Sequence, residues 1–157
     1  MKAQRRPDVT VASLNAKGGG RLPGLLRVEV IELTDAGIKG RMEVRPELLA
    51  PNGYLHAASV IALADTMAGY GAAAFLPPQA RAFTTIELKA NFLGTAREGV
   101  IECTATPLHL GRATQVWDAV VTAADARTIA AFRCTQMILR SEEHTSELQS
   151  PMYLVCR

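Results

Sequence analysis

The chain has 157 residues, of which 48% are hydrophobic, 20% are charged and 5% are aromatic. This length suits one domain, and the hydrophobic fraction is high enough for a packed core and too high for a disordered chain. Lys and Arg number 17 against 15 Asp and Glu, and this net charge of +2, with the basic residues scattered, argues against a nucleic-acid-binding protein.

The N-terminal residues are basic and polar, without the apolar stretch that a secretory signal needs, and no apolar run reaches the roughly 18 residues that span a bilayer. We therefore expect a cytoplasmic protein. Residues 1–24 are rich in Arg, Lys, Gly and Pro, which indicates a flexible arm with at most a short helix. Cys103 and Cys134 lie singly in apolar, strand-like stretches, as is typical of core residues in a reducing compartment.

Residues 26–34 and 38–44 alternate between apolar and polar side chains, and turn residues lie between them. The two-residue period predicts a β-hairpin. A loop containing Pro46, Pro51 and the turn signal Asn52-Gly53 follows.

Residues 55–74 are apolar and rich in Ala, which predicts a long buried helix that ends before Pro77-Pro78. Helical spacing places Asp65 on a stripe of small residues, opposite a stripe of larger apolar ones. A lone acid on an apolar helix is costly to bury without a function or a partner, so Asp65 is the strongest functional candidate. The alternative is a structural acid that accepts hydrogen bonds from a neighbouring strand or subunit.

The remaining chain predicts four strands, at residues 83–93, 100–106, 113–122 and 128–139, with Pro107 and Gly111 in the turn between the second and third. The order of two strands, one long helix and four strands predicts an antiparallel sheet wrapped around one buried helix, an α+β fold.

Three segments in this order resemble the hotdog-fold acyl-CoA thioesterases, and most closely the phenylacetate-degradation (PaaI-like) group. They are residues 44–72 (VRPELLAPNGYLHAASVIALADTMAGYGA), 84–93 (TTIELKANFL) and 109–117 (HLGRATQVW). The family pattern has an Asn in the loop, Gly-x-x-His-Gly-Gly at the helix start and Leu-Ala-Asp within the helix. The resemblance covers residues 25–139, and it departs from the family pattern at Ala57-Ala58, where the family has two glycines.

The resemblance implies hydrolysis of an acyl-CoA thioester to a carboxylic acid and free CoA. In the family, the acid that matches Asp65 attacks the thioester carbonyl or activates water to do so, and both roles stay open. The position of Ala57 implies that its backbone N–H polarises the thioester oxygen at the helix start. Asn52 is expected to orient water or the carbonyl, or else to be a turn residue.

Five further residues are candidates for substrate binding. His56 is expected to bond the ligand or to cap the helix, and Thr66 and Thr85 to bond substrate or the acid. Gly111 and Arg112 fall in a turn that the family places near coenzyme A, whose phosphates suit a guanidinium; a solvated turn arginine is the alternative.

The resemblance also implies a homo-oligomer, a dimer or a tetramer, in which Asp65 of one chain faces the Thr85 region of its partner. Neither a metal nor an organic cofactor is expected, since coenzyme A is part of the substrate. Two alternative functions are a non-catalytic acyl-CoA sensor and a hotdog hydratase or dehydratase. The hydratases have a His five residues after the Asp, where this chain has Tyr70.

The C-terminal stretch, residues 140–157, begins RSEEHTSELQSP, which resembles the in-frame translation of a sequencing adapter. We interpret it as a non-native tail and expect the domain to end near residue 139.

Overall fold

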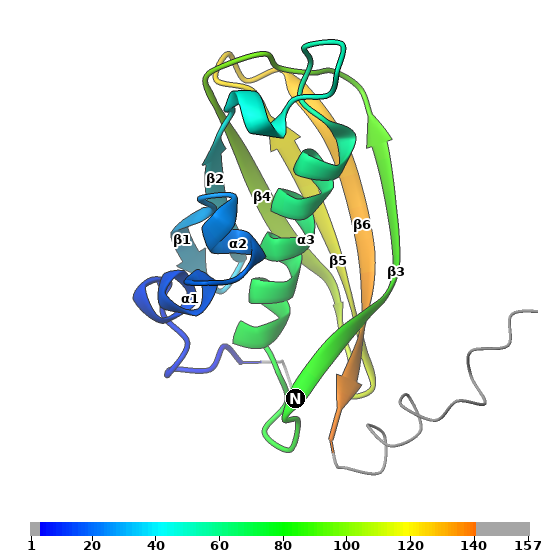
Figure 1. The fold of residues 1–157 in the computed structure, drawn as a ribbon. Coiled ribbons are helices and arrows are strands. Elements are labelled where there is room, and N and C mark those ends of the chain that lie inside the picture. The colour runs from blue at the N-terminus through cyan, green and yellow to red at the C-terminus, as the bar shows by residue number, and fades with distance from the viewer. Residues whose placement is uncertain (1–3, 141–157) are drawn as a thin grey trace, which may run out of the picture.

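One antiparallel sheet curves around one long helix in this protein (Figure 1). The structure, a computed structural model, describes residues 4–140. The sheet has the strand order β1-β2-β4-β5-β6-β3, and the helix, α3, spans Ala57–Ala74. The predicted α+β architecture is therefore confirmed. The strands are β1 (Glu29–Thr34), β2 (Gly37–Glu43), β3 (Ala82–Phe92), β4 (Val100–Leu110), β5 (Thr114–Thr122) and β6 (Thr128–Leu139).

Helix α3 is the centre of the core. Its larger apolar side chains Val60, Leu63 and Met67 are buried against the sheet, as the predicted stripe requires. Although Asp65 interrupts its apolar run, the whole helix is long and apolar enough to cross a membrane by length and composition alone, but here the sheet wraps around it. The apolar side chains of α3 are therefore explained by its position in the core of the domain.

Close packing of α3 on β5 depends on Gly71. A Cβ atom at this position would lie 2.6 Å from Cζ3 of Trp117, whose side chain is fully buried. The indole is also held by a hydrogen bond from its Nε1 to Oε1 of Gln115 at 3.0 Å, so it cannot move aside.

We expect Gly71→Ala to lower the free energy of unfolding by about 1–3 kcal/mol, because the overpacked indole must shift. Gly69→Ala is the matched control: its Cβ would meet Phe83 at 3.4 Å, an ordinary contact. The control should gain about 0.5–1 kcal/mol from the better helix propensity of Ala. Urea unfolding measures both variants, and equal stabilities would contradict this account of the packing.

The N-terminal segment corrects one expectation, because its described part is folded rather than a flexible arm. It forms α1 (Val11–Gly18) and α2 (Leu22–Leu25), and Leu14 of α1 is fully buried. Asn15 pairs with both backbone groups of Val30 on β1, at 2.8 and 3.0 Å. The glycine run, which suggested flexibility, instead ends α1. Strand β1 begins at Glu29 and not at residue 26 as predicted, because α2 extends to Leu25 and residues 26–28 connect it to the strand.

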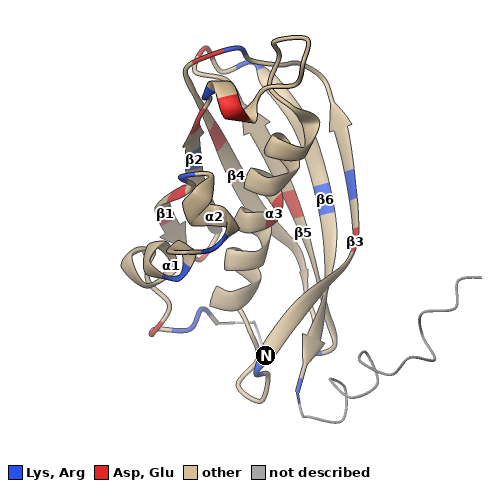
Figure 2. Ribbon diagram, viewed as in Figure 1, with Lys and Arg blue, Asp and Glu red and all other residues tan. Residues whose placement is uncertain are grey.

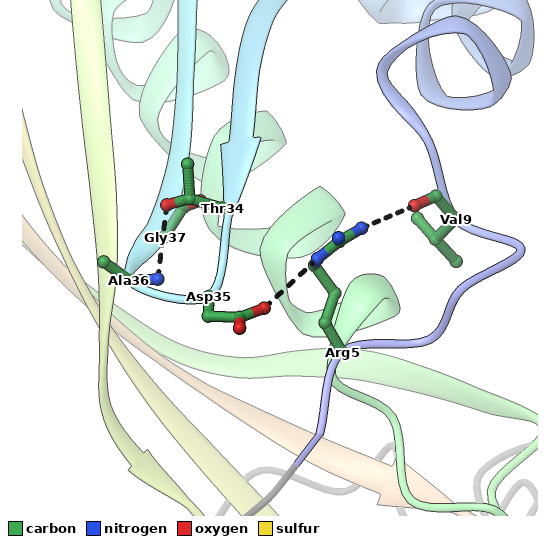
Figure 3. Close-up of polar contacts among 6 residues, drawn as sticks. All are labelled: Arg5, Val9, Thr34, Asp35, Ala36 and Gly37. Atoms are coloured by element: carbon green, nitrogen blue, oxygen red, sulfur yellow. Dashed lines mark hydrogen bonds and ion pairs between the residues drawn. The ribbon is translucent and has the colours of Figure 1, made fainter.

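Arg5 and Arg6 attach the start of this segment to the domain. The Arg5 guanidinium lies 3.4 Å from the Asp35 carboxylate in the β1–β2 turn and donates to the Val9 carbonyl at 3.3 Å (Figure 3). Arg6 donates to the carbonyl oxygens of Leu76, Pro77 and Ala80, just beyond α3.

Two further segments bear on the predictions. Strand β4 continues through Pro107 to Leu110, four residues beyond the predicted end, because a register shift between Pro107 and His109 accommodates the proline. The tail interpreted as adapter-derived lies, from residue 141 onward, outside the described residues.

Candidate functional site

Asp65 is the one charged residue of α3, which is otherwise apolar or neutral along its length (Figure 2). Its side chain is partly buried, and its Oδ1 accepts a hydrogen bond from the Thr85 hydroxyl at 3.2 Å. Thr85 lies on β3 of the same chain, so this hydrogen bond forms within one subunit, and the expected approach of Asp65 to the Thr85 region of a partner stays a prediction. The curved sheet brings β3 against α3 within one subunit.

Burial raises the pKa of the Asp65 carboxyl above its ordinary value, and the hydrogen bond from Thr85 opposes this rise. Because burial is the larger effect, the folded state holds the Asp65 proton more tightly than the unfolded chain does. A carboxylate with a raised pKa is a stronger base, which suits proton abstraction from water.

The raised pKa of Asp65 predicts a pH-dependent stability. Below the ordinary value of 3.8 the group is protonated in both states and carries no ionisation penalty. As pH rises through the folded pKa, the protein must bury a charge, and stability is lost. We expect Asp65→Asn to be more stable than the wild type at neutral pH, and the gap to close on acidification. Thermal unfolding from pH 3.5 to 8 measures this; a gap that does not change with pH would contradict it.

A second group of candidates lies at the N-terminus of α3. His56 is the N-cap residue, and its Nδ1 accepts the N–H of Ala58 at 2.9 Å. In a neutral ring this leaves Nε2 carrying the proton as a free donor. Ala57 is exposed, and its N–H has no acceptor among residues 4–140. The helix start therefore presents hydrogen-bond donors and the positive end of the helix dipole.

A single chain does not bring Asp65 and the Ala57 N–H to one reacting carbonyl. Asp65 follows Ala57 by eight residues on the same helix. At 1.5 Å per residue, that is about 12 Å along the helix axis. A thioester carbonyl spans far less than this distance, so the two groups of one subunit cannot both contact the same carbonyl.

The structure places two other candidates in local bonds. Asn52 is exposed, and its Oδ1 accepts the N–H of Tyr54 at 3.2 Å, which matches the turn-residue alternative. Thr66 donates its hydroxyl to the carbonyl of Ala62 at 2.6 Å, one turn back along α3. Neither side chain contacts Asp65.

Gly111 and Arg112 form the turn between β4 and β5, where the Gly111 N–H bonds the Thr114 carbonyl at 2.9 Å. This turn lies at the end of the sheet where α3 ends, away from the N-terminus of the helix (Figure 1). Close by, Gln115 donates to the carbonyl of Phe75, the C-cap of α3, at 3.0 Å. The structure therefore does not bring Arg112 and His56 of one chain together.

Sequence reasoning missed Gln136, which is fully buried on β6 and whose Oε1 lies 3.0 Å from the Thr85 hydroxyl. The alternation of buried and exposed residues along β6 could have identified Gln136. Its inward positions are otherwise apolar, and a single glutamine falls among them: Ala130, Phe132, Cys134, Gln136 and Ile138.

Comparison with known proteins identifies the family of this chain. The family model of the Thioesterase superfamily matches residues 52–130, which include α3 and Thr85. The chain belongs to this superfamily. Its hotdog fold is also that of a mutant of thioesterase PA1618 from Pseudomonas aeruginosa, with a TM-score of 0.83 and 25% sequence identity, over 87% of this chain and 99% of that one.

Two curated relatives of this thioesterase are named 1,4-dihydroxy-2-naphthoyl-CoA hydrolase. The protein from Escherichia coli (strain K12) is 30% identical over 83% of this chain and 96% of its own length. The protein from Listeria monocytogenes is 31% identical over 69% of this chain and 87% of its own length. The chain is accordingly an enzyme that hydrolyses thioesters.

Proposed function

We propose that this thioesterase hydrolyses an acyl-CoA to a carboxylic acid and free CoA, in the manner of the PaaI-like group. The observation that carries the proposal is Asp65, a half-buried carboxylate of raised pKa that a hydroxyl holds in place. The names of the E. coli and L. monocytogenes relatives support a CoA thioester as substrate.

In the proposed reaction, Asp65 takes a proton from water as the water oxygen attacks the thioester carbonyl carbon. The carbonyl oxygen gains negative charge, which the Ala57 N–H stabilises. The C–S bond then breaks, and the CoA sulfur leaves with the proton that Asp65 received. Direct attack by Asp65 is the alternative, through an anhydride that water cleaves. Water is the only co-reactant, and the scheme uses neither a metal nor an organic cofactor.

The remaining candidates are assigned to substrate binding. His56 offers its Nε2 proton, and Asn52 can turn its amide toward water or the carbonyl when substrate displaces its local bond. Thr85 bonds the acid, the Thr66 hydroxyl is assigned to the substrate, and Arg112, presented by Gly111, offers a guanidinium to the CoA phosphates. We place the reaction in the cytoplasm, where acyl-CoA is available and where the buried free thiols of Cys103 and Cys134 stay reduced.

A second copy of the chain is needed to complete this site, because about 12 Å separates Asp65 from the Ala57 N–H of its own helix. Strand β3 offers the surface for such a copy. Within residues 4–140 it pairs only with β6, which leaves its other edge open, and it exposes Ile86 (52%), Leu88 (41%) and Phe92 (45%). We propose a homodimer, able to pair again as a tetramer, whose site combines Asp65 of one subunit with Ala57 of the other. Light scattering at micromolar concentration tests this, and a monomer would overturn it.

The proposed activity is tested by measuring CoA thiol release from aryl, short-chain and medium-chain acyl-CoA esters. We expect turnover on at least one class, and the panel identifies the acyl group. Binding of acyl-CoA without release of thiol would instead favour a sensor, and would direct attention to Ala57-Ala58, which replaces the two glycines of the family pattern.

A further inference from the structure

A row of three polar side chains crosses the sheet beneath α3, on neighbouring strands. Thr85 on β3 is the registered partner of Gln136 on β6, and Gln136 is the registered partner of Gln115 on β5. Both glutamines are fully buried. Gln115 bonds structural groups, namely the Trp117 indole and the Phe75 carbonyl. Gln136 instead contacts the hydroxyl that holds Asp65.

The Thr85 hydroxyl has more acceptors than it can serve. Its Oγ1 lies 3.2 Å from Oδ1 of Asp65 and 3.0 Å from the Gln136 amide oxygen. A hydroxyl carries a single proton, so it donates to one of these oxygens at a time. On its other side the Gln136 amide nitrogen lies 3.3 Å from the Cys134 sulfur. A buried amide without hydrogen-bond partners is costly, so the Gln136 amide needs partners in both charge states of Asp65.

Two arrangements give each contact of this chain of hydrogen bonds one donor and one acceptor. When Asp65 is protonated, it donates to Thr85, Thr85 donates to the Gln136 oxygen, and the Gln136 nitrogen donates to the Cys134 sulfur. When Asp65 is ionised, Thr85 donates to Asp65. The Gln136 amide, rotated by half a turn, then donates to Thr85 and accepts the Cys134 S–H. The oxygen and nitrogen of an amide have nearly the same shape, so the rotation needs no extra space.

We propose that Gln136 is a positioning residue for Asp65, and that its amide reverses direction as Asp65 gains and loses a proton. This inference rests on the proposed role of Asp65 as base or nucleophile. In the ionised state, Gln136 fixes the Thr85 hydroxyl so that its proton points at the carboxylate. In the protonated state, it accepts the same hydroxyl proton and leaves Thr85 free to receive the proton of Asp65.

Few other titratable groups face this chain of hydrogen bonds. Burial raises the pKa of the Cys134 thiol to about 11, so the thiol keeps the proton that the ionised arrangement requires. On β3, Glu87 is exposed and accepts from Thr135. The charges of the other strands packed against α3 include outward-facing pairs: Lys39 with Glu102, and Arg133 with Asp118. Lys89 on β3 and His109 on β4 are exposed. On α3 itself the remaining titratable group is Tyr70, and on β4 the buried one is the Cys103 thiol, whose pKa burial raises to about 12. Both stay neutral in the working pH range.

The test follows the titration of the Asp65 carboxyl carbon by NMR in the full chain, together with the pH profile of kcat/KM. Gln136→Met keeps the size and burial but removes the amide. Gln115→Met is the matched control, because it removes an equally buried amide from the neighbouring strand. Thr85→Val removes the hydroxyl, and Thr85→Ser restores it. Cys134→Ala removes the far end of the hydrogen-bond chain without touching Asp65.

We expect Gln136→Met to move the Asp65 titration to higher pH and to lower kcat/KM on the acidic side of the pH profile, because the charge-assisted hydrogen bonds of the ionised form are the stronger of the two arrangements that lose Gln136. Gln115→Met should leave the titration in place while it lowers Tm. Thr85→Val should move the titration in the same direction, and adding Gln136→Met to it should add little, because Gln136 acts through Thr85. Thr85→Ser should restore the wild-type titration.

An unchanged titration in Gln136→Met, or full additivity with Thr85→Val, would overturn the proposal. If Gln136→Met fails to fold, Cys134→Ala is the deciding variant. A smaller shift of the Asp65 titration in the same direction supports the hydrogen-bond chain, and an unchanged titration contradicts it. The NMR titration needs no turnover. An inactive wild type would therefore count against the proposed hydrolysis and leave the role of Gln136 to be judged from the titration alone.

Discussion

Asp65→Asn is expected to reduce CoA thiol release by about 100 to 10,000-fold, the range over which a positioned base contributes to catalysis. The amide has the size of the carboxylate but can neither take a proton from water nor attack the thioester. The kcat on the best ester of the panel measures the loss, with Tm and oligomer size recorded on the same protein.

Asp118→Asn is the matched control for this substitution. Asp118 lies on β5 and pairs with Arg133 at the surface, with Nη2 and Oδ2 2.8 Å apart, so the same chemical change falls outside the site. An exposed pair contributes about 1 kcal/mol or less, and turnover should persist. The Asp65 variant should also be the more stable protein at neutral pH, because it no longer buries a charge. Loss of activity together with a gain of stability separates a functional acid from a structural one. Activity retained in Asp65→Asn would refute the proposed mechanism.

Ala57→Pro is expected to lower kcat by about 100 to 1,000-fold, the usual cost of losing one oxyanion donor. Ala57 is the first residue of α3, the position at which a helix accepts proline best, because its N–H makes no bond within the helix. The preceding His56 has φ −65° and ψ 136°, which is the conformation that a following proline favours. The substitution therefore removes the N–H and leaves the helix start in place. Steady-state kinetics measures the effect.

Ala57→Val controls for the added bulk, since it enlarges the side chain to a similar extent and keeps the N–H. We expect it to change KM more than kcat. Equal losses of kcat in the two variants would show that crowding of the site, and not the missing donor, is responsible. Wild-type kcat in Ala57→Pro would remove the Ala57 N–H from the mechanism.

Local sequence patterns were sufficient to predict much of the fold of this protein. The two-residue period of the strands and the apolar run 55–74 depend on neighbours in sequence, and they correctly predicted six strands around one helix. The cost of burying a lone acid is also a local argument, and it drew attention to Asp65, which the structure shows to be partly buried, with a pKa that burial raises. The prediction for the N-terminal segment was wrong because it, too, used only local sequence. Its composition resembles that of a flexible arm, and only packing of Leu14 and the bonds of Asn15 and Arg6 fold it onto the domain.

The architecture, the thioesterase resemblance and the candidate acid can therefore be predicted from local sequence, because they follow from periodicity, composition and short motifs. The side chains that surround Asp65 depend on long-range contacts. Thr85 lies 20 residues away and Gln136 another 51, and they meet because β3 pairs with β6 after the chain has crossed β4 and β5. The separation of Asp65 from the Ala57 N–H likewise follows from helix geometry, once α3 is known to be continuous from Ala57 to Ala74. Contacts between distant segments depend on strand order and register, which local patterns do not encode.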